Sequence, residues 1–151
     1  MAIINSNAIS TGAPVPGFGA GGGQVRTQYT IMTIPSGTTT TDSLNFFKLP
    51  QNARVLRVLG KNSALGGGTL NIGDAGYLGA DGVAVVADPD RYVAAQAVTT
   101  AGGWSTLATT GLFVKLGRYP VTVTGVFATG PTTTAGTVEL AIEYTVEEPQ
   151  A

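Results

Sequence analysis

The chain has 151 residues, no cysteine and no histidine, and 11% of its residues are charged, against about 25% in an average globular protein. The two absences exclude a disulfide framework, thiolate metal sites and any Ser-His-Asp or Cys-His catalytic site within this chain. The composition matches neither a coiled coil nor collagen, because its 22 glycines have no three-residue period.

The charges are unevenly distributed along the chain. Residues 1–61 contain five basic side chains and one acidic side chain, whereas residues 62–151 contain three basic and eight acidic side chains. A basic half and an acidic half suit self-association or docking on a charged partner. The alternative is that both halves share one fold and that their charges intermix on its surface. Lysine and arginine form no cluster, so we expect no nucleic-acid partner.

Residues 1–23 differ in composition from the rest of the chain. They contain no charged side chain and end in a glycine-rich run, and such a stretch cannot bury enough apolar surface to fold alone. It is either a disordered tail or an extended arm that a neighbouring subunit orders. We favour the glycine-rich N-terminal arm because it carries apolar side chains that gain from burial, namely Ile3, Ile4, Ile9, Val15 and Phe18.

From residue 24 onward, apolar and polar residues alternate with the period of β-strands. We predict strands at residues 25–34, 43–49, 54–59, 69–72, 83–87, 112–116, 121–127 and 137–146. In the last strand, five residues share one apolar face and two glutamates point the other way; the apolar residues are Val138, Leu140, Ile142, Tyr144 and Val146, and the glutamates are Glu139 and Glu143. Seven or eight short strands predict that residues 24–151 form an all-β, single-domain β-sandwich.

The segment Asp88-Pro89-Asp90-Arg91 interrupts this alternation. An aspartate cap followed by proline and a second acid in the first turn is typical of a helix start. Residues 92–98 are therefore either two helical turns or an extended edge segment. Asp74 and Asp81 lie upstream, but the spacing of these acids matches no calcium-binding loop. We expect Arg91 to form ion pairs that hold this segment against the sheet, and we expect no metal site.

The remaining motifs predict little chemistry. The glycines at 17–23 and the residues around Lys61 do not form a phosphate-binding loop, because the Walker spacing is absent. The threonine runs at 38–41 and 132–134 are typical of exposed loops. Trp104 either contacts a partner or covers the core. We predict no catalytic, cofactor-binding or metal-binding residue and expect that the protein is not an enzyme.

No apolar run approaches the ~20 residues that a membrane span needs, so we expect no membrane partner. The first residues lack the basic and apolar regions of a signal peptide. The sequence therefore predicts a soluble protein that is made in the cytoplasm.

Four short motifs carry a family resemblance. They are Leu49-Pro50-x-x-Ala53-Arg54-Val55-Leu56, Thr69-Leu70-Asn71-Ile72-Gly73-Asp74-Ala75, Asp88-Pro89-Asp90-Arg91-Tyr92 and Gly136-Thr137-x-x-Leu140-x-Ile142-x-Tyr144. In this order, over about residues 25–146, they resemble capsid decoration or cement proteins of tailed bacteriophages. The resemblance implies a jelly-roll β-sandwich and carries over no catalytic residue. The N-terminal arm lies outside it.

The same resemblance implies a function and partners. The protein is expected to be made in the host cytoplasm and to bind the major capsid protein on the outer capsid surface of the virion. It is also expected to form a homo-oligomer, with a trimer favoured because junctions between capsomers have local threefold symmetry. Two alternatives remain. A phage tail or fibre module that binds a host receptor would need an aromatic groove, and a small polysaccharide-degrading enzyme would need a carboxylate pair in a cleft.

Overall fold

A computed structural model describes residues 1–5, 24–79, 81–106 and 111–147. All regular elements in these ranges are β-strands. In chain order they are β1 (Ile3–Asn5), β2 (Arg26–Ile34), β3 (Ser43–Leu49), β4 (Ala53–Asn62), β5 (Thr69–Asp74), β6 (Tyr77–Leu78), β7 (Ala84–Val85), β8 (Asp88–Ala97), β9 (Gly102–Thr106), β10 (Val121–Thr129) and β11 (Gly136–Val146). The described residues include no helix long and apolar enough to cross a membrane.

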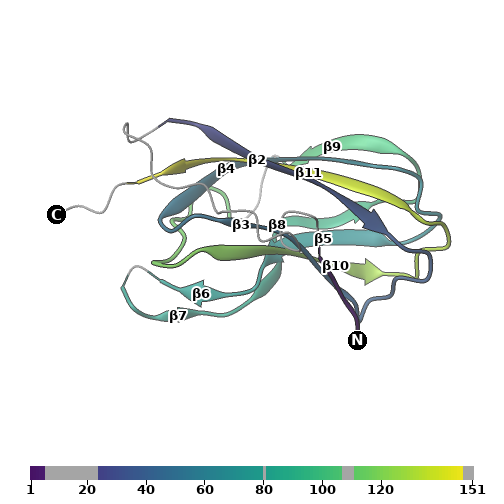
Figure 1. Cartoon of the computed structure of the whole chain (residues 1–151), viewed down its shortest axis with the longest axis horizontal. Coiled ribbons are helices and arrows are strands. Elements are labelled where there is room, and N and C mark those ends of the chain that lie inside the picture. Colours follow the sequence, from purple (N-terminus) through teal and green to yellow (C-terminus); the bar gives the residue numbers. More distant parts are fainter. Residues whose placement is uncertain (6–23, 80, 107–110, 148–151) are drawn as a thin grey trace.

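The strands form two layers, which Figure 1 shows one above the other. One sheet has the order β2-β11-β4-β9, and the other has the order β1-β3-β10-β5-β8. All pairs are antiparallel except β1 with β3, which is parallel. β6 and β7 form a separate small hairpin. The predicted all-β sandwich is therefore confirmed.

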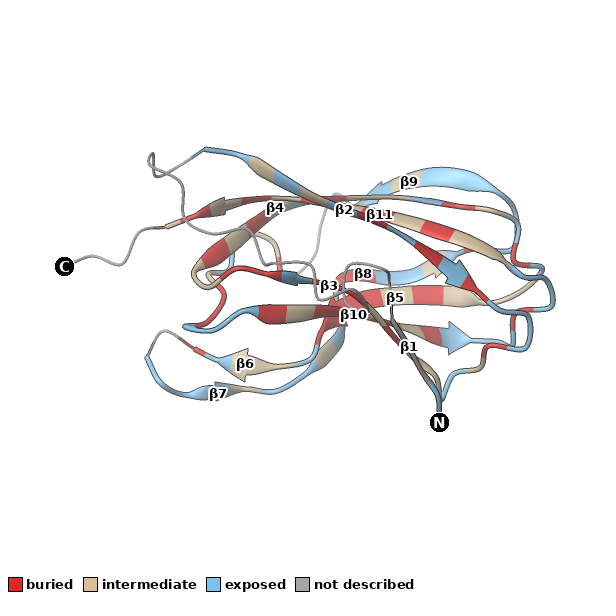
Figure 2. Cartoon of the chain, viewed as in Figure 1, coloured by how far each residue is buried: buried red, intermediate tan, exposed pale blue. Residues whose placement is uncertain are grey.

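The core lies between the two sheets and is built by the alternation seen in the sequence. In β11 every second residue from Val138 to Val146 is buried, as predicted, while Glu139 and Glu143 lie on the outer face. β10 alternates in the same way from Val121 to Phe127. Figure 2 shows buried positions alternating with less buried ones along these strands. Side chains from both sheets thus form one apolar cluster, and burying apolar surface is the main force that stabilises such a sandwich.

Most predicted strands are found within a few residues of their expected bounds. The strand predicted at 112–116 is wrong, because this segment is a turn followed by a single bridge between Arg54 and Lys115. Its amides bond the start of β4 instead, with Phe113 N donating to Val55 O and Leu116 N donating to Ala53 O. Within this segment only Leu116 is buried and Leu112 packs partly against the core, whereas Phe113 and Val114 are exposed.

The two alternatives for the segment after Asp88 are resolved in favour of an extended edge strand. β8 forms the edge of its sheet and pairs with β5, with irregular register at two points. Asp88 caps no helix; its Oδ1 accepts a hydrogen bond from the Asp90 amide at 3.3 Å. A pleated edge position tolerates Pro89, which has no amide to donate.

The N-terminal arm is described only at its start. Ile3–Asn5 pair with Ser43–Asn45 of the same chain, and the Ala2 amide donates to Asp42 Oδ1 at 2.9 Å. The Asp42 pKa is lowered by hydrogen bonds from the amides of Thr39 and Ala2. Residues 6–23, which hold the glycine run, lie outside the described residues.

The threonine runs are less exposed than predicted. Thr38 and Thr132 are buried, whereas their neighbours are partly or fully exposed. The Thr38 amide donates to Thr132 Oγ1 at 3.1 Å, and both hydroxyls donate to Pro35 O. The two loops thus pack together at one end of the sandwich, because each satisfies the polar groups of the other.

Candidate interaction surfaces

A buried ion pair joins β5 to β8. Arg91 Nε lies 2.6 Å from Asp74 Oδ2, and the Asp74 side chain is fully buried. The Tyr92 hydroxyl donates to the same oxygen at 3.3 Å, and Asp74 Oδ1 accepts from the Gly76 amide at 3.1 Å. Burial raises the pKa of Asp74, and the Arg91 charge acts in the opposite direction. Arg91 thus forms the ion pairs that were predicted to hold this segment against the sheet, with Asp74 as its main partner and Asp88 farther away at 3.9 Å.

The acids around this pair are not arranged as a metal site. Among the described residues, no group of three or more histidine, cysteine or acidic side chains is placed to hold an ion. Asp81 Oδ1 accepts from the Val83 amide at 3.0 Å, and Asp88 lies 3.9 Å from the Arg91 guanidinium. These carboxylates are thus used in turns and ion pairs.

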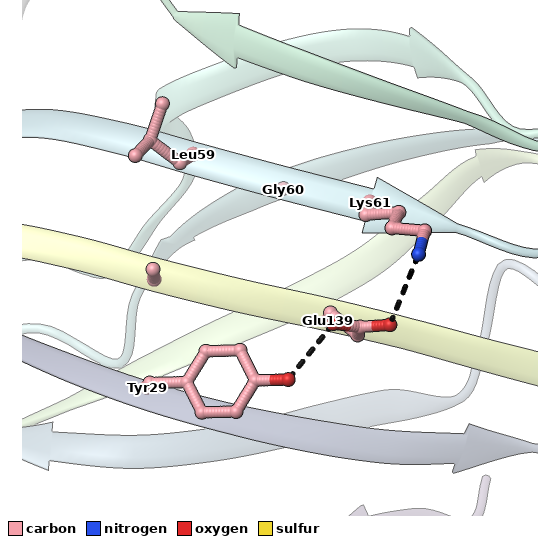
Figure 3. Close-up of a pocket in the computed structure, with 6 residues that line it drawn as sticks. Tyr29, Leu59, Gly60, Lys61 and Glu139 are labelled. Atoms are coloured by element: carbon pink, nitrogen blue, oxygen red, sulfur yellow. Dashed lines mark hydrogen bonds and ion pairs between the residues drawn. The ribbon is translucent and has the colours of Figure 1, made fainter.

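The outer face of the β2-β11-β4-β9 sheet carries a shallow pocket, which Figure 3 shows. Side chains from β2 and β4 converge on Glu139 of β11: the Tyr29 hydroxyl donates to Glu139 Oε2 at 2.8 Å, and Lys61 Nζ lies 3.9 Å from Oε1. The hydrogen bond to the carboxylate raises the pKa of Tyr29. Leu59 and Ala141 form the apolar part of the lining. We call the outward-facing residues of this sheet the sheet face.

Apolar and charged side chains share the sheet face. Tyr29 is 52% exposed and Ile31 is 47% exposed. Two residues before Leu59 on β4, Arg57 forms two hydrogen bonds to the Glu143 carboxylate, at 2.8 and 3.1 Å. The basic residues lie on β4 and the acidic residues on β11. The charges of the two halves of the chain therefore intermix within one sheet, as the alternative interpretation of the charge distribution predicted.

Trp104 lies on β9, opposite Gly60 of β4. Its indole packs against the core, and its Nε1 donates to Asn62 Oδ1 at 3.2 Å. A Cβ added at Gly60 would lie 2.1 Å from the indole, so only glycine leaves room for the ring. Trp104 therefore covers the core, which is the second of its two predicted roles. Sequence reasoning missed β9 because it begins with two glycines, which strands usually avoid.

Large exposed apolar side chains gather in two segments near one end of the sandwich. The first is the β6–β7 hairpin with its flanks, and the second is the segment 111–120. The Arg118 amide donates to Leu78 O at 3.2 Å, which joins the two. We call their exposed apolar residues the apolar end: Leu78, Val83, Val86, Phe113, Val114 and Tyr119.

At the apolar end, Phe113 has an unusual backbone conformation. Its φ is 64°, in the left-handed region, and its side chain is 61% exposed. A non-glycine residue in this region stores about 1–3 kcal/mol of strain, and such strain is enriched at functional sites. The fold thus holds an aromatic ring in solvent at a local energetic cost, which is expected of a contact residue.

No protein-family model matches the sequence, and no curated protein matches it. Two solved structures do. A chain of the "Cyanophage Pam1 capsid asymmetric unit" is 29% identical, with a TM-score of 0.64 over 89% of this chain and 92% of that chain. A chain of the "Capsid of Ralstonia phage GP4" is 19% identical, with a TM-score of 0.78 over 97% and 99% of the two chains. The protein is similar to components of two phage capsids.

Proposed function

We propose that the protein is a non-enzymatic structural component of a bacteriophage virion that binds the outer surface of the capsid and stabilises the shell. The observation that carries this proposal is the similarity to the Pam1 capsid chain, at 29% identity over nearly the whole of both chains. The matched chain is thus about as long as this one.

The strand order supports the same proposal. The eight strands of five or more residues divide into β2-β11-β4-β9 and β3-β10-β5-β8. Along the chain from β2 to β5 they alternate between the two sheets, as they do again from β8 to β11. This arrangement supports a jelly roll of two four-stranded sheets, a type common in viral capsid proteins.

The apolar end supports attachment to a shell. The centres of protein interfaces are depleted in charge and enriched in aromatic residues, and Phe113 and Tyr119 are both more than half exposed here. Binding to the assembled shell but not to free subunits stabilises the shell by mass action. A symmetric oligomer, with a trimer favoured, multiplies weak contacts into tight attachment.

The test uses capsids of the encoding phage that were assembled without this protein. We expect that adding the protein back raises the temperature at which the shells rupture. Rupture is measured as the signal of a dye that binds the released DNA. Electron microscopy should place the protein on the outer surface. Equal rupture temperatures with and without the protein, or a location at the tail tip only, would overturn the proposal in favour of a receptor-binding module.

Paired variants test the apolar end within the same assay. Val86→Asp places a charge on a residue that is 84% exposed, so folding should be unaffected while binding to shells weakens at least tenfold. Thr99→Asp adds the same charge to an exposed residue after the opposite end of β8 and serves as the matched control. Equal binding by both variants would exclude the apolar end as the contact surface.

A further inference from the structure

We propose that the sheet face is a self-complementary contact, on which a second copy of this chain packs about a twofold axis. The inference deepens the self-association that is part of the proposed function. The outward residues of this face belong to four strands in the order β2-β11-β4-β9. Aligned packing of two sheet faces is a common arrangement in β-proteins.

The charges of the sheet face lie in two neighbouring columns. β11 contributes Glu139 and Glu143, and β4 contributes Lys61 and Arg57 at the same levels of the ladder. A twofold axis parallel to the strands and between β11 and β4 exchanges these two strands. It therefore places Lys61 of each copy over Glu139 of the other, and Arg57 over Glu143. Each carboxylate would then lie between two cations, one from its own chain and one from the second copy.

The same axis exchanges the outer strands, and their side chains are complementary in size. β2 carries the large residues Tyr29 and Ile31 outward. β9 carries Ser105 and Gly103 outward, at the levels of Leu59 and Lys61. Ala141 of β11 pairs with Tyr29 of β2 on one side and with Leu59 of β4 on the other, so these residues lie at one level. The axis therefore places Tyr29 over Ser105, which lies at the same level. By the same reasoning, Ile31 is placed over Gly103, where no side chain obstructs it.

This arrangement distinguishes a second copy from other occupants. Charge and size match row by row only when the partner carries the same four strands. Tyr29, Ile31 and Leu59 would be buried between the copies and supply the affinity, while the charged columns would fix the orientation. A twofold axis within the plane, perpendicular to the strands at the level of Ala141, would instead bring Glu139 over Glu143 and oppose like charges. A twofold contact doubles the existing unit, from monomer to dimer or from trimer to hexamer.

Charge reversal followed by mixing tests the contact on the free protein. Sedimentation equilibrium of the wild type should show a unit that doubles in mass with concentration. Lys61→Glu alone and Glu139→Lys alone should each weaken this doubling at least tenfold, because like charges then face one another. A 1:1 mixture of the two variants should restore it, since each acid again faces a base across the axis.

The mixing step separates this contact from a role within one chain. Neither variant regains its internal Lys61–Glu139 pair in the mixture, so recovery requires contact between copies. Lys48→Glu is the matched control, because Lys48 is an exposed residue of β3, which belongs to the opposite sheet. A wild type that does not double in mass, variants that still double, or a mixture without recovery would each overturn the inference. Capsid binding is absent from this assay, so its failure is separate from failure of the proposed function.

Discussion

Arg91 neutralises a carboxylate that the fold buries completely. The Asp74 side chain has no exposed surface, and Arg91 is 13% exposed. The attraction between the two charges offsets the cost of burying them, whereas an isolated buried charge is strongly unfavourable. The pair therefore links β8 to β5 in addition to the backbone pairing of the two strands.

We expect Arg91→Ala to lower the free energy of unfolding by about 3–5 kcal/mol, because it leaves Asp74 buried without its counter-charge. Urea denaturation at neutral pH measures this loss. Arg57→Ala is the control, since Arg57 is half-exposed in its pair with Glu143 and exposed pairs contribute about 1 kcal/mol or less. Equal losses in the two variants would show that the Arg91 pair contributes no more than a surface pair.

The deficit of Arg91→Ala should depend on pH. Burial raises the pKa of Asp74 above the ordinary value of 3.8, and in the wild type Arg91 partly offsets this rise. Without Arg91 the folded state favours the protonated acid more strongly than the unfolded state does. The loss of stability of Arg91→Ala relative to wild type should therefore be small below about pH 3.8. It should grow as the pH rises through the folded-state pKa of Asp74. A deficit that does not change with pH would contradict burial of an ionised Asp74.

At the scale of elements, the pairing of β9 with β4 depends on the absence of a side chain at Gly60. Gly60 leaves the space that the Trp104 ring occupies against the core. The ring is also held by its hydrogen bond to Asn62, whose amide nitrogen donates to Thr100 O at 2.8 Å. A short strand that starts with two glycines is thereby held in register through its single aromatic residue.

Gly60→Ala should displace the indole and destabilise the protein by about 1–3 kcal/mol, as overpacking usually does. Trp104 is the single tryptophan of the chain, so its fluorescence reports the change directly. We expect emission to shift to longer wavelength as the ring moves toward water. Gly102→Ala is the matched control, because a Cβ there meets nothing within 4 Å. An unshifted spectrum in Gly60→Ala would mean that the edge adapts without releasing the ring.

At the scale of the whole molecule, the N-terminal arm remains a separate unit in our proposal. The core consists of residues from Met32 to Val146, and the described start of the arm pairs only with the edge of β3. Deleting residues 1–23 should therefore leave the cooperative unfolding transition in place. We expect it to weaken binding to shells severalfold, measured by co-sedimentation with capsids. Binding as tight as that of the full chain would contradict a role for the arm in attachment.

The low charge content also makes a prediction for the whole particle. Only 11% of residues are charged, and four charges of the sheet face are already paired within the chain. Attachment to shells should therefore weaken less than tenfold between about 0.05 and 0.5 M salt, although screening shortens the range of charge interactions. Co-sedimentation at increasing salt measures this, and a steep loss would indicate attachment through ion pairs.

The sequence by itself determined the sandwich. Strict alternation in residues 137–146 places Val138 and its partners on one face, and a strand with this pattern is stable only when that face is buried. The same reasoning identified most of the long strands and predicted that Arg91 forms ion pairs, although not that Asp74 is its main partner. These features are local, because they follow from side-chain period and from turn residues next to one another in the chain.

Only the tertiary structure decided which distant residues meet. Whether residues 112–116 pair as a strand depends on β4, which lies more than 50 residues earlier. Arg57 and Glu143 are 86 residues apart, and their pairing follows from the register of β4 on β11. The need for glycine at position 60 is explained only by the Trp104 ring that packs beside it. Local patterns specify the face that a strand buries, whereas register and sheet order come from the packing of the whole chain.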